Sequence, residues 1–114
     1  MRRAVIPVVI LCAMLANNAA AAGDNGAGRG RSFVQKYCSR CHAIGLTGNS
    51  PYAPAPPFRT LHERYDVGDL AEAFAEGIIV AHEGGPQMPR FMLQPSQIDD
   101  LISYLRSIQP KNAT

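Results

Sequence analysis

The sequence has no tryptophan, few aromatic residues and few cysteines, and each shortage limits the classes of protein to which it can belong. Its 114 residues are enough for one small domain but not for two ordinary ones. Aromatic residues make up 7% of the chain, so few large side chains are available for a core, although 46% hydrophobic residues exclude a wholly disordered chain. No useful length of alternating polar and apolar residues is present, and no segment repeats. The sequence therefore predicts a small all-α domain with three to four short helices and long loops.

The chain also has no large excess of positive or negative residues. The formal net charge is +2, and the excess of basic residues consists of Arg2 and Arg3. Without the first 22 residues, nine basic residues face nine acidic ones, and the only lysines are Lys36 and Lys111. A nucleic-acid-binding protein needs a basic patch or stripe, which this pattern does not offer. We therefore expect no nucleic-acid partner.

The long hydrophobic run at the start of the chain is too short for a membrane span. Ala4 to Ala16 form an apolar run of 13 residues after a basic start, whereas a spanning helix needs about 20. Small residues at 20–22 suit cleavage before Gly23. We predict a signal peptide at 1–22, with an uncleaved anchor as the alternative, and a mature domain at 23–114. This predicts a periplasmic location, reached by general secretion.

The mature chain alternates helical patterns with loops. Helical spacing of apolar residues is found at 24–37, 67–77 and from Ser96 to Pro110. We expect Asp24 and Asp66 to cap the first two helices, and a capping box of Ser96 and Asp99 to open the third. Four prolines mark 43–57 as a loop, and a Gly/Pro-rich loop is predicted at 81–95. Loops this long bury little apolar surface, so the centre of the domain needs another occupant.

Two cysteines remain after the leader, and their spacing points to a cofactor. Cys38, Cys41 and His42 form the pattern C-x-x-C-H, which is typical of covalent c-type haem attachment. On one helical turn, residues three apart share a face, so both thiols reach one edge of a porphyrin. The ring of His42 then supplies one axial ligand of the iron. One covalently bound haem c would fill the centre of the domain.

Two alternatives use the same cysteines. A redox-active C-x-x-C would need a βαβ setting, and no strand pattern flanks it. A zinc site would need His62 and His82 to complete the cysteines, but these histidines are 20 residues apart and form no ligand pair. We otherwise read His62 as a surface or loop residue.

The sixth ligand of the iron is predicted to be Met88. It lies in a Gly/Pro-rich loop, and Pro89 favours an extended backbone there. Met92 is a rival that we expect to cover the haem or to pack in the core. His82 would give a bis-histidine site, and an open site is a further alternative.

With these landmarks in order, the mature chain resembles the class I, monohaem c-type cytochromes. The resemblance rests on the C-x-x-C-H motif, on Met88-Pro89-Arg90-Phe91 and on the closing segment from Asp100 to Leu105. It implies that Gly30 is the glycine where the first and last helices cross, packed by Leu101 and Tyr104. It also implies that the carbonyl of Pro56 accepts a hydrogen bond from His42. Candidates for contact with the haem propionates are Tyr52, Arg59, Arg64 and Tyr65.

The sequence differs from the pattern of this family in two features. The ring of lysines by which mitochondrial relatives dock acidic partners is absent. Val34 also stands where relatives often carry an aromatic residue, and Phe33 beside it is the expected substitute.

We therefore expect a one-electron carrier with His/Met ligation of the haem iron. We expect it to be a monomer that exchanges electrons with redox partner proteins, and a membrane complex is one candidate partner. No catalytic triad, carboxylate pair or phosphate loop is present, so we expect no enzymatic activity. The alternatives are a cytochrome subunit of a dehydrogenase or oxidase complex, and a haem protein with a labile sixth ligand.

Overall fold

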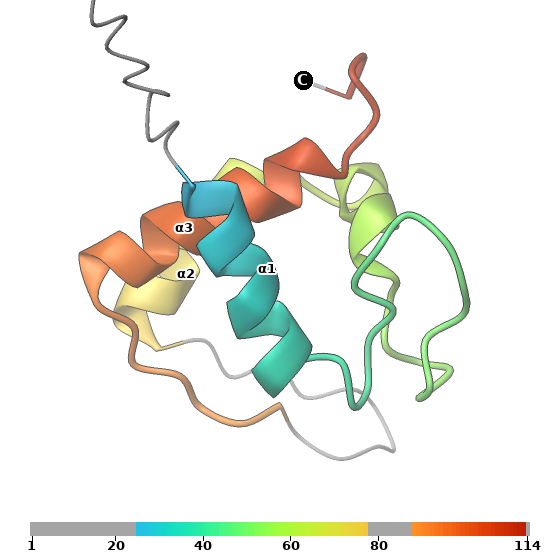
Figure 1. Ribbon diagram of the computed structural model, residues 1–114, viewed down its shortest axis with the longest axis horizontal. Helices are drawn as coiled ribbons and strands as arrows, with labels where there is room; N and C mark the ends of the chain where they lie inside the picture. Colours follow the sequence, from blue (N-terminus) through green and yellow to red (C-terminus); the bar gives the residue numbers. More distant parts are fainter. Residues whose placement is uncertain (1–24, 78–87, 114) are drawn as a thin grey trace, which may run out of the picture.

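The computed structural model describes residues 25–77 and 88–113, and the elements in these residues are helices (Figure 1). The α-helices are α1 (Gly26–Tyr37), α2 (Leu70–Glu76) and α3 (Pro95–Ser107). Two short 3₁₀ helices, η1 (Phe58–Glu63) and η2 (Val67–Asp69), precede α2. No strand is formed within the described ranges, and the all-α prediction is confirmed.

Helices α1 and α3 cross in close contact at Gly30. A Cβ atom on Gly30 would lie 2.7 Å from the carbonyl carbon of Asp100 and 2.8 Å from the Cβ of Tyr104. Only glycine leaves room for this approach of two backbones. Leu101 is almost completely buried in the same helix. The crossing of the first and last helices that we expected at Gly30 is therefore present.

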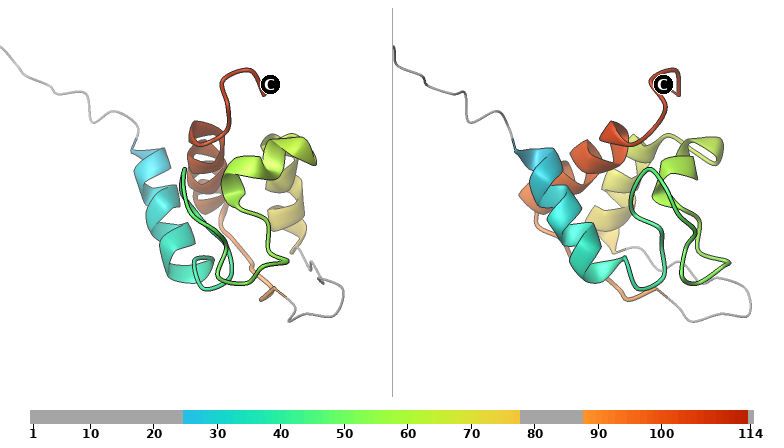
Figure 2. Two further views of the ribbon diagram at one scale, coloured as in Figure 1. Left: turned by 90° about the vertical axis from the view of Figure 1, so that its right-hand side faces the viewer. Right: turned by 45° about the vertical axis from the view of Figure 1, so that its right-hand side comes forward.

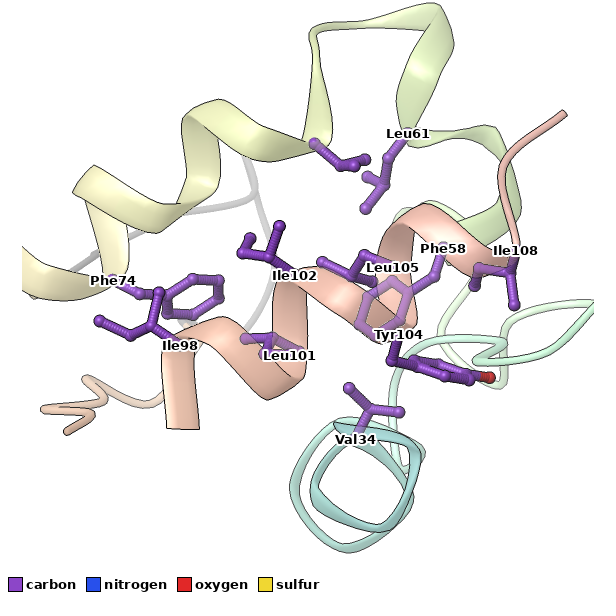
Figure 3. Close-up of a cluster of buried hydrophobic side chains, with 11 residues drawn as sticks. Val34, Phe58, Leu61, Phe74, Ile98, Leu101, Ile102, Tyr104, Leu105 and Ile108 are labelled. Atoms are coloured by element: carbon purple, nitrogen blue, oxygen red, sulfur yellow. The ribbon is translucent and has the colours of Figure 1, made fainter. Parts of the chain in front are cut away.

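The hydrophobic core is arranged around α3 (Figure 3). The apolar residues of α3 and of its C-cap position recur at helical spacing and are buried: Ile98, Leu101, Ile102, Leu105 and Ile108. Val34 packs against them from α1, and Phe58, Leu61, Val67 and Phe74 from the short helices on the other side. The amphipathic pattern of the last helix thus identified the centre of the core.

The observed helix ends agree with the predicted ones in the middle of the chain, but the start of α3 differs from its prediction. The Asp66 side chain accepts a hydrogen bond from the Gly68 N–H at 2.7 Å, and Gly77, with φ +86°, is the C-cap residue that follows the last residue of α2. The helix at 67–77 therefore exists, with its first turn as η2. At α3, however, the capping box is formed by Gln94 and Gln97, because Pro95 is already the first helical residue. The predicted box of Ser96 and Asp99 is wrong.

The start of α1 is only partly described. The helix begins at Gly26 with Asn25 as the N-cap residue. Asp24, the expected cap, lies outside the described residues. The glycines at 26, 28 and 30 did not prevent helix formation, and two of them, Gly26 and Gly30, are buried against the rest of the domain.

The 3₁₀ helix η1 was not predicted from the sequence. It connects the loop at 43–57 to the core (Figure 2). His62 lies in this helix, and its Nδ1 is 3.1 Å from the side-chain oxygen of Gln109. Gln109 also donates to the Phe58 carbonyl at 2.8 Å. His62 is thus half-buried and joins η1 to the end of α3, so its assignment to a surface or loop position was wrong.

The helices in 25–77 and 88–113 are all too short or too polar to span a lipid bilayer.

Candidate cofactor site

The C-x-x-C-H motif forms a tight turn directly after α1. Cys38 is the C-cap residue of the helix, and its carbonyl accepts hydrogen bonds from the N–H groups of Cys41 at 3.2 Å and His42 at 3.0 Å. The turn keeps the chain in a near-helical path, so the two thiols and the imidazole stay within one short segment. Both thiols are free and half-buried.

These three residues line a cavity of about 270 Å³ together with the segment that contains Met88. The cavity lies between the end of α1, the loop after the motif and the residues before α3. Its lining consists of Lys36, Tyr37, Cys38, Arg40, Cys41, His42, Tyr52, Met88, Pro89 and Phe91. Two thiols, an imidazole and a thioether thus meet in one mostly apolar space, although Met88 and His42 are far apart in the sequence.

The imidazole of His42 is buried, with 6% of its surface exposed, and its orientation is fixed. Nδ1 lies 2.8 Å from the carbonyl oxygen of Pro56. Since a carbonyl oxygen can only accept, Nδ1 carries the proton, and the lone pair remains on Nε2. The Phe58 ring packs against the imidazole with the ring centroids 4.7 Å apart. His42 is therefore held in the tautomer that a metal ligand requires.

The donor set of the cavity fits haem c better than zinc or thiol chemistry. Burial, with a smaller contribution from Cys41, raises the pKa of the Cys38 thiol to about 12. Disulfide exchange uses a thiolate, which this environment disfavours. A structural zinc site needs four ligands, commonly Cys and His side chains. No group of three or more His, Cys, Asp or Glu side chains suited to a metal ion gathers in the described parts of the chain.

The two methionines have different surroundings. Met88 lines the cavity, whereas Met92 has 84% of its surface exposed to solvent. The expectation that Met92 packs in the core is wrong, because its side chain is exposed. Met92 is also not among the residues that line the cavity. His82 lies outside the described residues.

An aromatic cluster joins α1 to the segment that follows Met88. Phe91 packs edge-on against Phe33 and Tyr37, with ring centroids 5.9 and 6.1 Å apart. Phe33 and Tyr37 also contact each other at 4.8 Å. Their spacing of four residues in α1 indicated a shared face, but their contact with Phe91 had no signal in the sequence beyond the aromatic residue itself. The cluster anchors the Met88 segment beside the motif.

The four candidates for contact with the haem propionates lie at different places on the structure. Tyr52 lines the cavity. Arg59 lines a different groove, beside Leu46 and Ile108. Arg64 and Tyr65 are exposed and belong to neither lining. Of the four, only Tyr52 is among the residues that line the cavity, and contact with the propionates stays a prediction.

Comparison with known proteins agrees with this geometry. Residues 27–109 match the sequence model of the cytochrome c family. The chain is 26% identical over 102 residues to cytochrome c-552 of Bradyrhizobium diazoefficiens. The aligned residues cover 90% of this chain and 91% of that relative. No solved structure matches the chain.

Proposed function

The chain belongs to the cytochrome c family, and we propose that it is an exported one-electron carrier whose haem iron is ligated by His42 and Met88. Membership of the family means that the chain carries covalent haem c and exchanges electrons with redox partners. When bound, the haem supplies an iron that takes up and returns one electron. The observation that carries the proposal is the cavity that brings Met88 together with Cys38, Cys41 and His42.

Cys38 and Cys41 are the proposed points of covalent attachment. They lie three residues apart in a near-helical turn that lines the cavity. Two bonds to one short segment fix the cofactor beside His42.

His42 and Met88 are the proposed axial ligands. The hydrogen bond from Nδ1 to the Pro56 carbonyl directs Nε2 of His42 as the ligating atom and raises its basicity. Met88 offers a soft thioether, which favours reduced iron and raises the reduction potential. The aromatic cluster holds the segment after Met88 against α1.

The first 22 residues are proposed as a signal peptide, so the mature protein is periplasmic and starts at Gly23. The basic start, the apolar run and the small residues before Gly23 support this. Attachment of haem to C-x-x-C-H outside the cytoplasm requires an unfolded chain, which favours general secretion. Partners would be redox proteins that form small, short-lived interfaces.

Expression of the full chain in bacteria that mature c-type cytochromes tests the proposal. We expect haem to remain with the denatured polypeptide, and N-terminal sequencing of the periplasmic protein to begin at Gly23. Cys38→Ala and Cys41→Ala each remove one attachment point, while Ser39→Ala between them serves as the control. The purified protein should titrate as a one-electron couple and should not bind carbon monoxide. Absence of covalent haem would refute the attachment, and rapid carbon monoxide binding would favour a labile sixth ligand.

A further inference from the structure

A serine side chain holds the peptide group that follows His42. The N–H of Ala43 donates a hydrogen bond to Oγ of Ser50 at 2.9 Å, in a part-buried position. This N–H belongs to the same planar peptide unit as the carbonyl of His42. Fixing it therefore fixes the ψ angle of His42, and with it the direction in which the imidazole leaves the backbone.

The neighbouring peptide groups are held by backbone atoms. The Cys41 carbonyl accepts from the N–H of Tyr52 at 3.2 Å, and the Ala43 carbonyl accepts from the N–H of Phe58 at 2.9 Å. These bonds would persist in any side-chain variant of the loop. Between them, the bond from Ala43 N–H depends on the Ser50 hydroxyl, which a single substitution removes.

The same loop holds the ring of His42. Ser50 and Pro56 both lie in the loop at 43–57, and the Pro56 carbonyl accepts a hydrogen bond from Nδ1–H, with 2.8 Å between nitrogen and oxygen. Ser50 thus fixes the backbone of His42 while Pro56 fixes its ring. If the backbone contact is lost, the ring can turn and its hydrogen bond to Pro56 weakens.

We propose that Ser50 is a positioning residue for His42, which sets the geometry of the bond from Nδ1 to the Pro56 carbonyl and thereby the electron donation of the imidazole. The inference rests on the proposed role of His42 as an axial ligand. A stronger hydrogen bond at Nδ1 makes Nε2 a better donor, which stabilises the oxidised iron. Loss of the Ser50 oxygen should therefore raise the reduction potential.

Three variants of the haem-loaded protein test this. Ser50→Ala removes the acceptor, Ser50→Thr keeps an oxygen at the same position, and Ser50→Cys keeps the size but offers a weak acceptor. Ser107→Ala is the matched control, because it removes a part-buried hydrogen bond of 2.6 Å from a serine hydroxyl to the Tyr104 carbonyl at the end of α3. The measurements are the reduction potential and the solvent exchange rate of the His42 Nδ1 proton by NMR.

We expect Ser50→Ala to raise the potential and to speed the exchange of the Nδ1 proton. Ser50→Cys should shift the potential and the exchange rate in the same direction but by less. This variant replaces Ser50→Ala in the test if Ser50→Ala does not accumulate. Ser50→Thr should retain the wild-type values, and Ser107→Ala should lower thermal stability without moving either one. Wild-type values in Ser50→Ala or in Ser50→Cys, or a shift in Ser50→Thr as large as in Ser50→Ala, would overturn the proposal. Failure of the underlying function is distinguishable, because wild-type protein would then lack covalent haem or histidine ligation.

Discussion

Gly30 of α1 and Asp100 of α3 meet backbone to backbone, with no space for a side chain between them. A methyl group on Gly30 would lie 2.7 Å from the Asp100 carbonyl carbon, so the helices must move apart. Because α3 carries most of the core, this displacement disturbs the packing that supports the whole site.

Gly30→Ala should therefore lower the free energy of unfolding by about 1–3 kcal/mol, the usual cost of overpacking. Chemical denaturation of the haem-loaded protein measures the effect. Gly28→Ala is the control in the same helix, because the atoms nearest to its new methyl group belong to the exposed, movable Asn25 side chain and not to a backbone. That variant should be neutral or more stable by up to about 1 kcal/mol, since alanine favours helix. Equal effects of the two substitutions would contradict the account of the crossing.

Tyr104→Phe should remove a link between α3 and the loop after His42. The Tyr104 hydroxyl donates to the Ile44 carbonyl at 2.5 Å, and the residue is buried. The substitution leaves this part-buried carbonyl without that partner, which should cost about 1–3 kcal/mol of stability. Tyr37→Phe, at a residue with 47% of its surface exposed, should change stability by less than about 0.5 kcal/mol. A neutral Tyr104→Phe would show that the hydroxyl does not secure the loop.

Acid should remove the contribution of the ion pair between Arg29 and Asp100. The side chains form two hydrogen bonds of 2.7 Å, and these, opposed in part by desolvation and aided by the charge of Arg29, lower the pKa of Asp100. Because the folded-state pKa lies below the unfolded value of about 3.9, the stabilisation is complete above that value and is lost as the pH falls through the folded pKa.

The difference in melting temperature between wild type and Asp100→Asn should therefore be constant near neutral pH and should shrink below about pH 4. The pair is exposed on the Arg29 side, so the difference should also be small and should decrease in salt. Asp99→Asn, at the exposed neighbouring position, is the control. A difference that grew on acidification would contradict the assigned shift.

The sequence predicted the elements whose signals are local. The C-x-x-C-H spacing, the apolar repeat of α3, the cap at Asp66 and the stop at Gly77 each depend on residues close in the chain, and the structure has the corresponding elements. The crossing at Gly30 came from the family resemblance, because nothing near Gly30 indicates which residue faces it.

What the sequence missed depends on contacts between distant residues. The segment 58–63 is too short for an amphipathic repeat, and η1 is held by Gln109 from beyond α3. Gln94 rather than Ser96 opens α3, because the side chains of Gln94 and Gln97 each accept a hydrogen bond from the backbone N–H of the other residue. Ser50 resembles any loop serine until its bond to Ala43 is seen.

Replacement of Met88 tests the central claim most directly. In the haem-loaded wild type we expect the charge-transfer band that marks a bond between sulfur and ferric iron. Met88→Ala should abolish this band and open the iron to carbon monoxide, while Met92→Ala, at a side chain that is 84% exposed, should leave the spectrum unchanged. A band that survives in Met88→Ala and is lost in Met92→Ala, or a wild type without the band, would contradict ligation by Met88.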